Sequence, residues 1–280
     1  MLLKIVVATL VVLLVGALLA LWIARRVFDM ALTRDVARLA ETLPRPAPAD
    51  EAMLQALPAP VQRYLRFAIP NGRRPPWYAR LEHEGDFRLQ ADGPWLPMQG
   101  TEHFFAGRPA FVWSGRIRMM PGLSVAVHDH YAEGRGGVDA RLLGALPIAR
   151  GSGREVDQSA LLRLLGEVSI LPSALLPSSW LRWEAMDDRH ARAIVADAGV
   201  EGSAVFTFDD EGRITAYDTE DRYRTVGERH VRTPFFGRWR DYRRFGDVMA
   251  PTYGEGGWLL DGRETIYVRM RVTDVRYDAP

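Results

Sequence analysis

The chain contains no cysteine among its 280 residues. This absence excludes disulfide bonds, thiolate metal sites and a cysteine nucleophile, and also lipid attachment at a bacterial lipobox cysteine. It does not identify a compartment, because a reducing cytosol and a disulfide-free periplasm both permit a chain without cysteine.

The sequence also lacks an excess of charge and any recognisable catalytic motif. Its 36 Lys and Arg residues are balanced by 35 Asp and Glu residues, and the basic ones are scattered, so no nucleic-acid partner is predicted. Walker, G-x-G-x-x-G, G-x-S-x-G and H-E-x-x-H motifs are missing. His128 and His130 have the spacing of metal ligands, but no third ligand is evident. We therefore predict no cofactor and no metal, and we favour a role other than catalysis.

One long apolar run lies near the N-terminus, from Ile5 to Ala24. It holds 20 residues without a charge, and as a helix it would be about 30 Å long, which matches the hydrocarbon core of a membrane. A cleaved signal peptide has a shorter apolar core and a small-x-small cleavage site. We therefore interpret residues 1–24 as an uncleaved, single-pass transmembrane anchor.

The flanking charges leave the orientation of this anchor open. Lys4 precedes the run, whereas Arg25, Arg26, Arg34 and Arg38 follow it. The positive-inside rule, applied to this count, places the rest of the chain in the cytoplasm. A short N-terminus with one basic residue is, however, also typical of an exported signal-anchor.

Residues 25–57 are predicted to form a helical juxtamembrane segment and a Pro-rich linker, with an extended spacer at Pro44, Pro46 and Pro48. A helix over Val61–Ile69 is predicted to present Val61, Tyr64, Leu65 and Ala68 on one side, and Asn71-Gly72 ends it. Asp50 can cap a short helix before it.

Residues 58–280 are predicted to form one antiparallel β domain with a helical insertion near 157–176. Tyr78–Gln90 alternates apolar and polar residues, and repeated short turns follow along the chain. Asp157 or Ser159 is expected to cap the inserted helix. The fold class is therefore α+β, with a membrane helix before a large antiparallel sheet.

A polar row is expected on the apolar face of the first strands. A turn at Asp92-Gly93 would place His83 opposite Glu102, and the row would continue past Gly115 to Asp129. Trp113 shares this face. These residues could form a polar spot in a ligand cavity or an acid/base site, or else a cross-strand ion pair without a ligand.

The stretch from Phe235 to Trp258 is predicted to be a β-hairpin with its turn at Gly246-Asp247. Counting from that turn places Arg238 opposite Glu255 and Trp239 over Gly254. We expect Arg238 and Glu255 to form an ion pair on the inner, apolar side of the sheet and count both as candidate ligand-binding residues.

The phrase Trp239-Arg240-Asp241-Tyr242-Arg243, followed by the Gly-Asp turn and Val248-Met249-Ala250-Pro251, resembles a hairpin in the LolA/LolB/LppX-like class. Those proteins are periplasmic carriers of lipoproteins and lipids. The resemblance implies an unclosed half-barrel whose concave face is apolar and covered by helices, and a domain outside the cytoplasm at the bacterial inner membrane. The chain departs from that class by keeping a long anchor.

Residues 58–277 also resemble DUF6544 (formerly DUF6920), a bacterial family of unknown function. The matching stretches are Pro60-Val61-Gln62-Arg63-Tyr64, Phe111-Val112-Trp113, Met120-Pro121-Gly122-Leu123, Ala140-Arg141-Leu142-Leu143-Gly144 and Pro234-Phe235-Phe236-Gly237-Arg238. This resemblance supplies no catalytic residues.

Three functions follow as hypotheses. The first is a membrane-anchored module of the cell envelope that binds a lipid or another apolar ligand in the concave face. The second is a structural or partner-binding component of an envelope complex. The third is a hydrolase-type enzyme that uses His83, Glu102 and Asp129.

Overall fold

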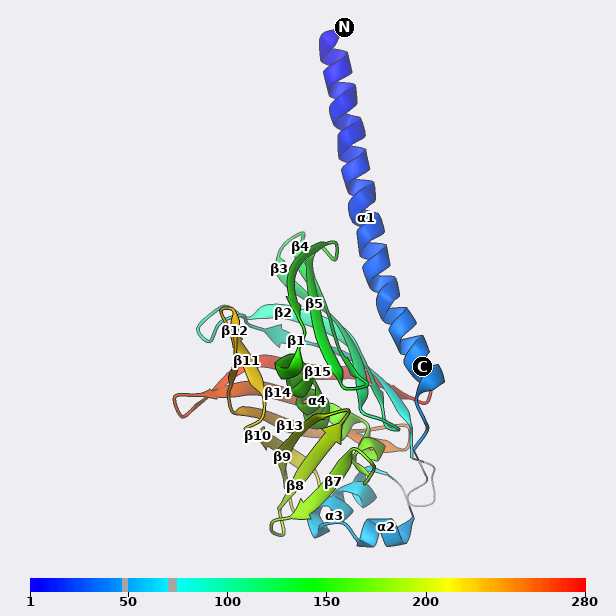
Figure 1. Cartoon of the computed structure of the whole chain (residues 1–280), viewed down its shortest axis with the longest axis vertical. Helices are drawn as coiled ribbons and strands as arrows, with labels where there is room; N and C mark the ends of the chain where they lie inside the picture. The colour runs from blue at the N-terminus through cyan, green and yellow to red at the C-terminus, as the bar shows by residue number, and fades with distance from the viewer. Residues whose placement is uncertain (47–49, 70–74) are drawn as a thin grey trace.

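The computed structural model describes residues 1–46, 50–69 and 75–280 and contains one sheet of 13 strands (Figure 1). The order across the sheet is β6-β5-β4-β3-β2-β1-β15-β14-β13-β10-β9-β8-β7, and neighbouring strands pair antiparallel. The edge strands β6 and β7 do not pair with each other, so the sheet is unclosed. This confirms the predicted α+β half-barrel.

The strands fall into two runs that meet where β1 pairs with β15. The first run is β1 (Tyr78–Phe87), β2 (Leu96–Phe105), β3 (Ala110–Met120), β4 (Leu123–Ala132), β5 (Arg135–Leu142) and β6 (Leu146–Gly151). The second run is β7 (Leu181–Ala185), β8 (His190–Asp197), β9 (Val200–Phe208), β10 (Ile214–Thr219), β13 (Phe235–Phe245), β14 (Val248–Leu260) and β15 (Arg263–Tyr277). A separate hairpin of β11 (Tyr223–Val226) and β12 (Arg229–Arg232) is inserted between β10 and β13.

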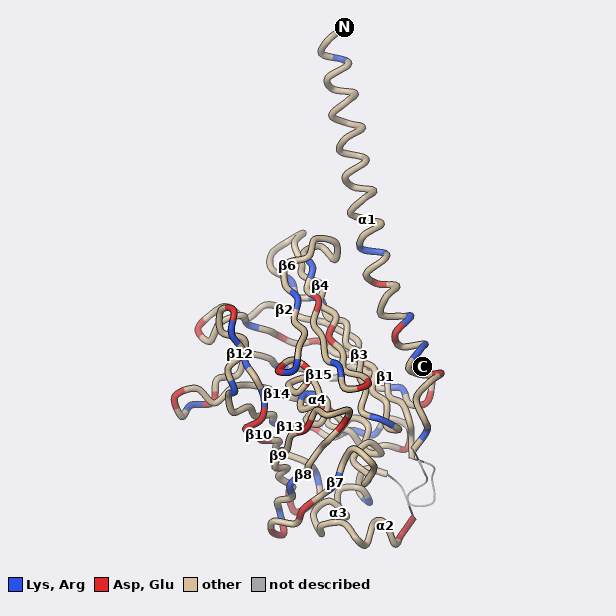
Figure 2. The backbone as a smooth tube through the Cα atoms, viewed as in Figure 1, with Lys and Arg blue, Asp and Glu red and all other residues tan. Residues whose placement is uncertain are grey.

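Helix α1 (Leu2–Thr42) is the one helix in the described residues that is long and apolar enough to cross a membrane. Its first half projects away from the sheet and carries almost no charge (Figure 2). Its second half packs on the outer face of the sheet, where Val36 and Leu39 join a cluster with Trp77 and Val112. The ring of Phe28 also stacks on His128, with centroids 3.6 Å apart.

Two short helices follow α1. Helix α2 (Glu51–Gln55) is capped by Asp50, whose carboxylate accepts a hydrogen bond from the Met53 backbone N–H at 2.7 Å, as predicted. Helix α3 (Ala59–Ala68) buries the four residues of its predicted face, namely Val61, Tyr64, Leu65 and Ala68. The predicted spacer at Pro48 and the turn at Asn71-Gly72 lie outside the described residues.

The predicted helical insertion is α4 (Arg154–Glu167), followed by the 3₁₀ turns η1 (Val168–Ile170) and η2 (Pro172–Leu175). It lies inside the curve of the sheet (Figure 1), where Leu161, Leu164 and Leu165 are buried in the main core. The predicted caps are wrong, because the helix begins earlier, after Gly153. Asp157 instead accepts a hydrogen bond from the Gly136 backbone N–H at 2.7 Å, and Ser159 Oγ accepts one from Tyr223 at 2.8 Å.

The predicted register of the first hairpin is wrong by two residues. His83 pairs with Gly100, and Leu81 pairs with Glu102. The connection between β1 and β2 is longer than the expected tight turn at Asp92-Gly93. A shift of two residues keeps every side chain on the same face, so apolar alternation cannot detect it.

The β13–β14 hairpin has the predicted register, but the predicted ion pair is wrong. Arg238 is opposite Glu255 and Trp239 is opposite Gly254. Trp239 faces inward and donates to the Gly166 carbonyl at 3.1 Å, which directs its neighbour Arg238 to the outer face. Arg238 there pairs with Asp218 at 2.9 Å and with Glu264, while Glu255 pairs with Arg269 at 3.4 Å.

Candidate functional site

A cavity of about 270 Å³ lies between α4 and the concave face of the sheet. Its apolar walls come from both runs of strands and include Phe87, Met98, Val268 and Met270. Charged side chains also border it, among them Arg163 of α4 and Arg222 of the loop before β11. The cavity therefore combines an apolar surface with a few polar groups, which is typical of small-molecule sites.

Two glycines on neighbouring strands create part of this space. The row Tyr217, Gly237, Gly256 and Val268 crosses β10, β13, β14 and β15. Tyr217 faces inward, where its hydroxyl donates to the Leu162 carbonyl of α4 at 2.6 Å, so Gly237 has the same direction. A Cβ atom at Gly237 would lie 3.7 Å from Tyr217 Cδ1, an ordinary contact. The sheet is thus left uncovered at Gly237, whereas a Cβ atom at Gly256 would lie 3.1 Å from Val268 Cγ1.

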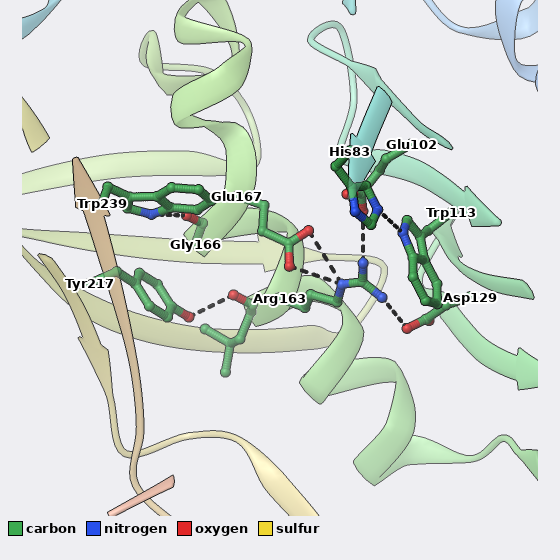
Figure 3. Close-up of polar contacts among 10 residues, drawn as sticks. His83, Glu102, Trp113, Asp129, Arg163, Gly166, Glu167, Tyr217 and Trp239 are labelled. Atoms are coloured by element: carbon green, nitrogen blue, oxygen red, sulfur yellow. Dashed lines mark hydrogen bonds and ion pairs between the residues drawn. The ribbon is translucent and has the colours of Figure 1, made fainter. Parts of the chain in front are cut away.

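A largely buried charge cluster centred on Arg163 borders the cavity (Figure 3). Arg163 binds Glu102 at 2.9 Å and Glu167 at 3.1 Å, and it also binds Asp129. Glu102 and Asp129 come from β2 and β4, so one helix residue joins two strands. The guanidinium also lies 5.0 Å from the ring centroid of Trp113, within the range of a cation–π contact.

This cluster holds three carboxyl groups around one guanidinium. Burial raises the pKa of Glu102 well above its ordinary value, and the Glu167 carboxylate raises it further. Burial also raises the pKa of Asp129, although Arg163 opposes this effect. The three carboxylates outweigh the burial of Arg163 and raise the pKa of the guanidinium well above normal. The cluster is therefore able to hold a proton on Glu102 while Arg163 stays charged.

His83 lies beside this cluster and is 3% exposed. Its Nε2 accepts a hydrogen bond from the Trp113 indole N–H at 2.8 Å, which places the proton of the neutral ring on Nδ1. Burial lowers the pKa of His83 to about 4, so the ring is neutral at pH 7. Among the described residues, Nδ1 has no hydrogen-bond partner.

Four of the six predicted site residues are brought together, namely His83, Glu102, Trp113 and Asp129. The missing side chain at Gly115 does not leave space for a ligand, because the Trp113 ring lies there. Arg238 and Glu255 are not part of the cluster, since their side chains form ion pairs on the outer face, although Glu255 is among the residues that line the cavity.

Sequence reasoning missed Arg163, which organises the site. The sequence feature that could have indicated it is an arginine within the leucine-rich segment of the inserted helix, four residues before Glu167. That spacing also suits an exposed ion pair on a helix. Only the packing of α4 against β2 and β4 distinguishes the buried case.

Residues 47–270 match a family described as a family of unknown function, DUF6544. The chain belongs to the DUF6544 family. This membership confirms the resemblance expected from the sequence. No curated protein matches the chain.

Three solved structures are similar to this DUF6544 chain, each at 12% identity. The match with a LolA superfamily protein from Nitrosomonas europaea covers 80% of this chain and 96% of that protein, with a TM-score of 0.35. The match with a putative outer membrane lipoprotein-sorting protein domain from Vibrio parahaemolyticus covers 72% of this chain and 86% of that domain, with a TM-score of 0.37. The match with a DUF1329 family protein from Desulfovibrio piger covers 83% of this chain and 95% of that protein, with a TM-score of 0.41. The expected similarity to LolA-like proteins is thus found among solved structures.

Proposed function

We propose that this protein is a membrane-anchored binding module that holds an apolar ligand in the cavity of its concave face. The observation that carries the proposal is the cavity of about 270 Å³ lined by Gly237 and Gly256. Protein interiors are normally close-packed, and voids lined by apolar atoms reduce stability. A space of this kind beside a buried charge cluster therefore supports a binding role.

The size of the cavity limits the ligand. Small-molecule sites span roughly 300–1,000 Å³, so this cavity lies just below that range. It suits one apolar chain or one small apolar molecule. A lipid with two long chains would extend beyond it.

The anchor places the domain beside the membrane in this proposal. The turn between β5 and β6 contacts α1, because a Cβ atom at Gly144 would lie 3.2 Å from Arg25 Cγ. Arg25 directly follows the apolar run Ile5–Ala24. If that run spans the bilayer, this edge of the sheet lies at its surface. We propose the bacterial inner membrane as its location, with the domain outside the cytoplasm.

Native mass spectrometry of the detergent-solubilised full-length chain, with lipid extraction of the same sample, tests the binding role. We expect wild-type protein to carry an apolar adduct. Gly237→Leu should lose the adduct because its side chain enters the cavity, whereas Gly237→Ala should keep it. Thermal unfolding of both variants verifies that they are folded. Wild-type protein without an adduct, or folded Gly237→Leu with an unchanged adduct, would contradict the proposal.

A partner-binding role in an envelope complex is a second candidate, supported by exposed apolar side chains near the anchor. Met120, Leu146 and Ile148 are 57%, 50% and 54% exposed. They lie close to the two strand connections joined by the hydrogen bond from Leu143 N–H to the Ser124 carbonyl at 2.8 Å. A pull-down from membranes that recovers this protein alone would count against this role.

A further inference from the structure

Arg222 is a second arginine at the cavity, in the loop between β10 and β11. It is 8% exposed. Its guanidinium lies 4.0 Å from the ring centroid of Phe235 and 5.4 Å from that of Trp258. Phe235 also lines the cavity, and these two aromatic rings hold the guanidinium against its wall.

Arg222 differs from Arg163 in its partners. Arg163 binds three carboxylates, whereas the Arg222 side chain makes no ion pair or hydrogen bond with the described residues. Its Nε atom is fully buried without a partner. The charge of Arg222 acts on the Asp129 carboxylate without a direct contact. Burial of a charge without a direct partner is costly, and the stacking on Phe235 and Trp258 offsets only part of that cost. The guanidinium is therefore available to an anion that enters the cavity.

We propose that the cavity binds an amphiphile with a single acidic head group, whose carboxylate or phosphate pairs with Arg222 and whose apolar chain fills the space beyond. This inference rests on the proposed binding function and names the class of its ligand. A guanidinium offers two parallel N–H donors to a carboxylate or phosphate, and stacking on Phe235 fixes the plane of those donors.

The charge cluster at Arg163 sets the direction of the bound molecule. Its guanidinium is already surrounded by Glu102, Asp129 and Glu167, so a further anion there would meet negative charge. The acidic head is thus directed to Arg222. The apolar chain then lies along Val268 and Met270, which line the same cavity.

Binding of matched amphiphiles to the full-length chain tests this assignment. The probes are dodecanoate, dodecyl phosphate and dodecanol, which share one chain length, together with acetate and inorganic phosphate as free anions. Native mass spectrometry of the detergent-solubilised protein measures occupancy against ligand concentration. The variants are Arg222→Met, which removes the charge and keeps an unbranched side chain, and Arg229→Met, which removes an exposed charge on the neighbouring hairpin.

We expect wild-type protein to bind at least one of the acidic probes about tenfold or more tightly than dodecanol, as is typical of one charge-assisted pair. Arg222→Met should reduce acidic-probe binding to the dodecanol level and leave dodecanol unchanged, while Arg229→Met should behave as wild type. Comparison of dodecanoate with dodecyl phosphate identifies the preferred head group.

Four results would overturn the inference. Equal binding of acid and alcohol by wild-type protein would leave the apolar binding function intact and remove the role of Arg222. An acid preference that survives in Arg222→Met would place the head group elsewhere. Binding of free phosphate or acetate as tightly as the amphiphiles would show an anion site without an apolar chain. If no probe with a chain binds, the proposed function fails as well.

Discussion

Two pairs of inward-facing glycines lie on the concave face in the described residues, and the side chains next to them differ. Gly100 is opposite Gly115 in the first run of strands, and Gly237 is opposite Gly256 in the second. A Cβ atom at Gly115 would lie 2.1 Å from the Trp113 ring, whereas one at Gly237 would meet no atom closer than 3.7 Å. The first pair is therefore covered by the Trp113 ring. In the second pair Gly237 is open, whereas a Cβ atom at Gly256 would lie 3.1 Å from Val268 Cγ1.

The difference comes from the direction in which a neighbouring tryptophan leans. The Trp113 ring lies along its own strand over Gly115 and donates a hydrogen bond to His83. Trp239, two residues after Gly237, lies across the strand over Gly254, where a Cβ atom would be 2.4 Å from its ring. A glycine pair thus indicates missing side chains, and the adjacent indole decides whether a cavity results.

The largest expected effect on stability is from Arg163→Met, whose side chain contacts the first run of strands. The substitution leaves the buried Glu102 and the partly buried Asp129 without their cation, so we expect the free energy of unfolding at pH 7 to fall by about 3–5 kcal/mol. Chemical denaturation of the purified chain measures this loss. Arg163→Met combined with Glu102→Gln should recover part of it, because fewer carboxylates then lack a partner.

The loss of unfolding free energy in Arg163→Met should depend on pH. The folded-state pKa of Glu102 is already raised, and removal of the guanidinium raises it further, because Arg163 lowers it in the wild type. A raised carboxyl pKa stabilises the folded state at low pH, and that stability is lost as pH rises through the folded-state pKa. Denaturation should therefore show a smaller deficit at pH 5 than at pH 8. An equal loss at both pH values would show that no carboxyl group around Arg163 gives up its proton between pH 5 and pH 8, and would contradict this expected pH dependence.

The next largest effect on stability is expected from Gly115→Ala, in β3 of the same run of strands. The added methyl group would overlap the Trp113 ring, and the ring cannot move without breaking its hydrogen bond to His83. We expect a loss of about 2–3 kcal/mol in unfolding free energy. Thermal unfolding measures it, and tryptophan fluorescence should report displacement of Trp113. An unchanged melting temperature would show that this pair is not filled as described.

The sequence predicts the inner face well because alternation has a period of two, and it placed His83, Glu102, Trp113 and Asp129 on that face correctly. It could not fix the pairing of His83, since a two-residue shift preserves the face. It also missed Arg163 and Arg222, because their burial depends on packing between segments far apart in the chain. The family resemblance named no site residues, so these arginines required the structure.

The smallest effect, and the one that separates the two glycine pairs most directly, is from Gly237→Ala. Its methyl group would make only ordinary contacts with Tyr217, and the backbone of Gly237 is not in the left-handed region. Alanine also reduces the conformational entropy of the unfolded chain, which stabilises proteins by about 0.4–1 kcal/mol where the backbone permits it. We therefore expect an unfolding free energy that is unchanged or raised by up to about 1 kcal/mol, opposite in sign to Gly115→Ala. Destabilisation by the same amount as Gly115→Ala would mean that the row at Gly237 is packed, and the cavity would lose its structural basis.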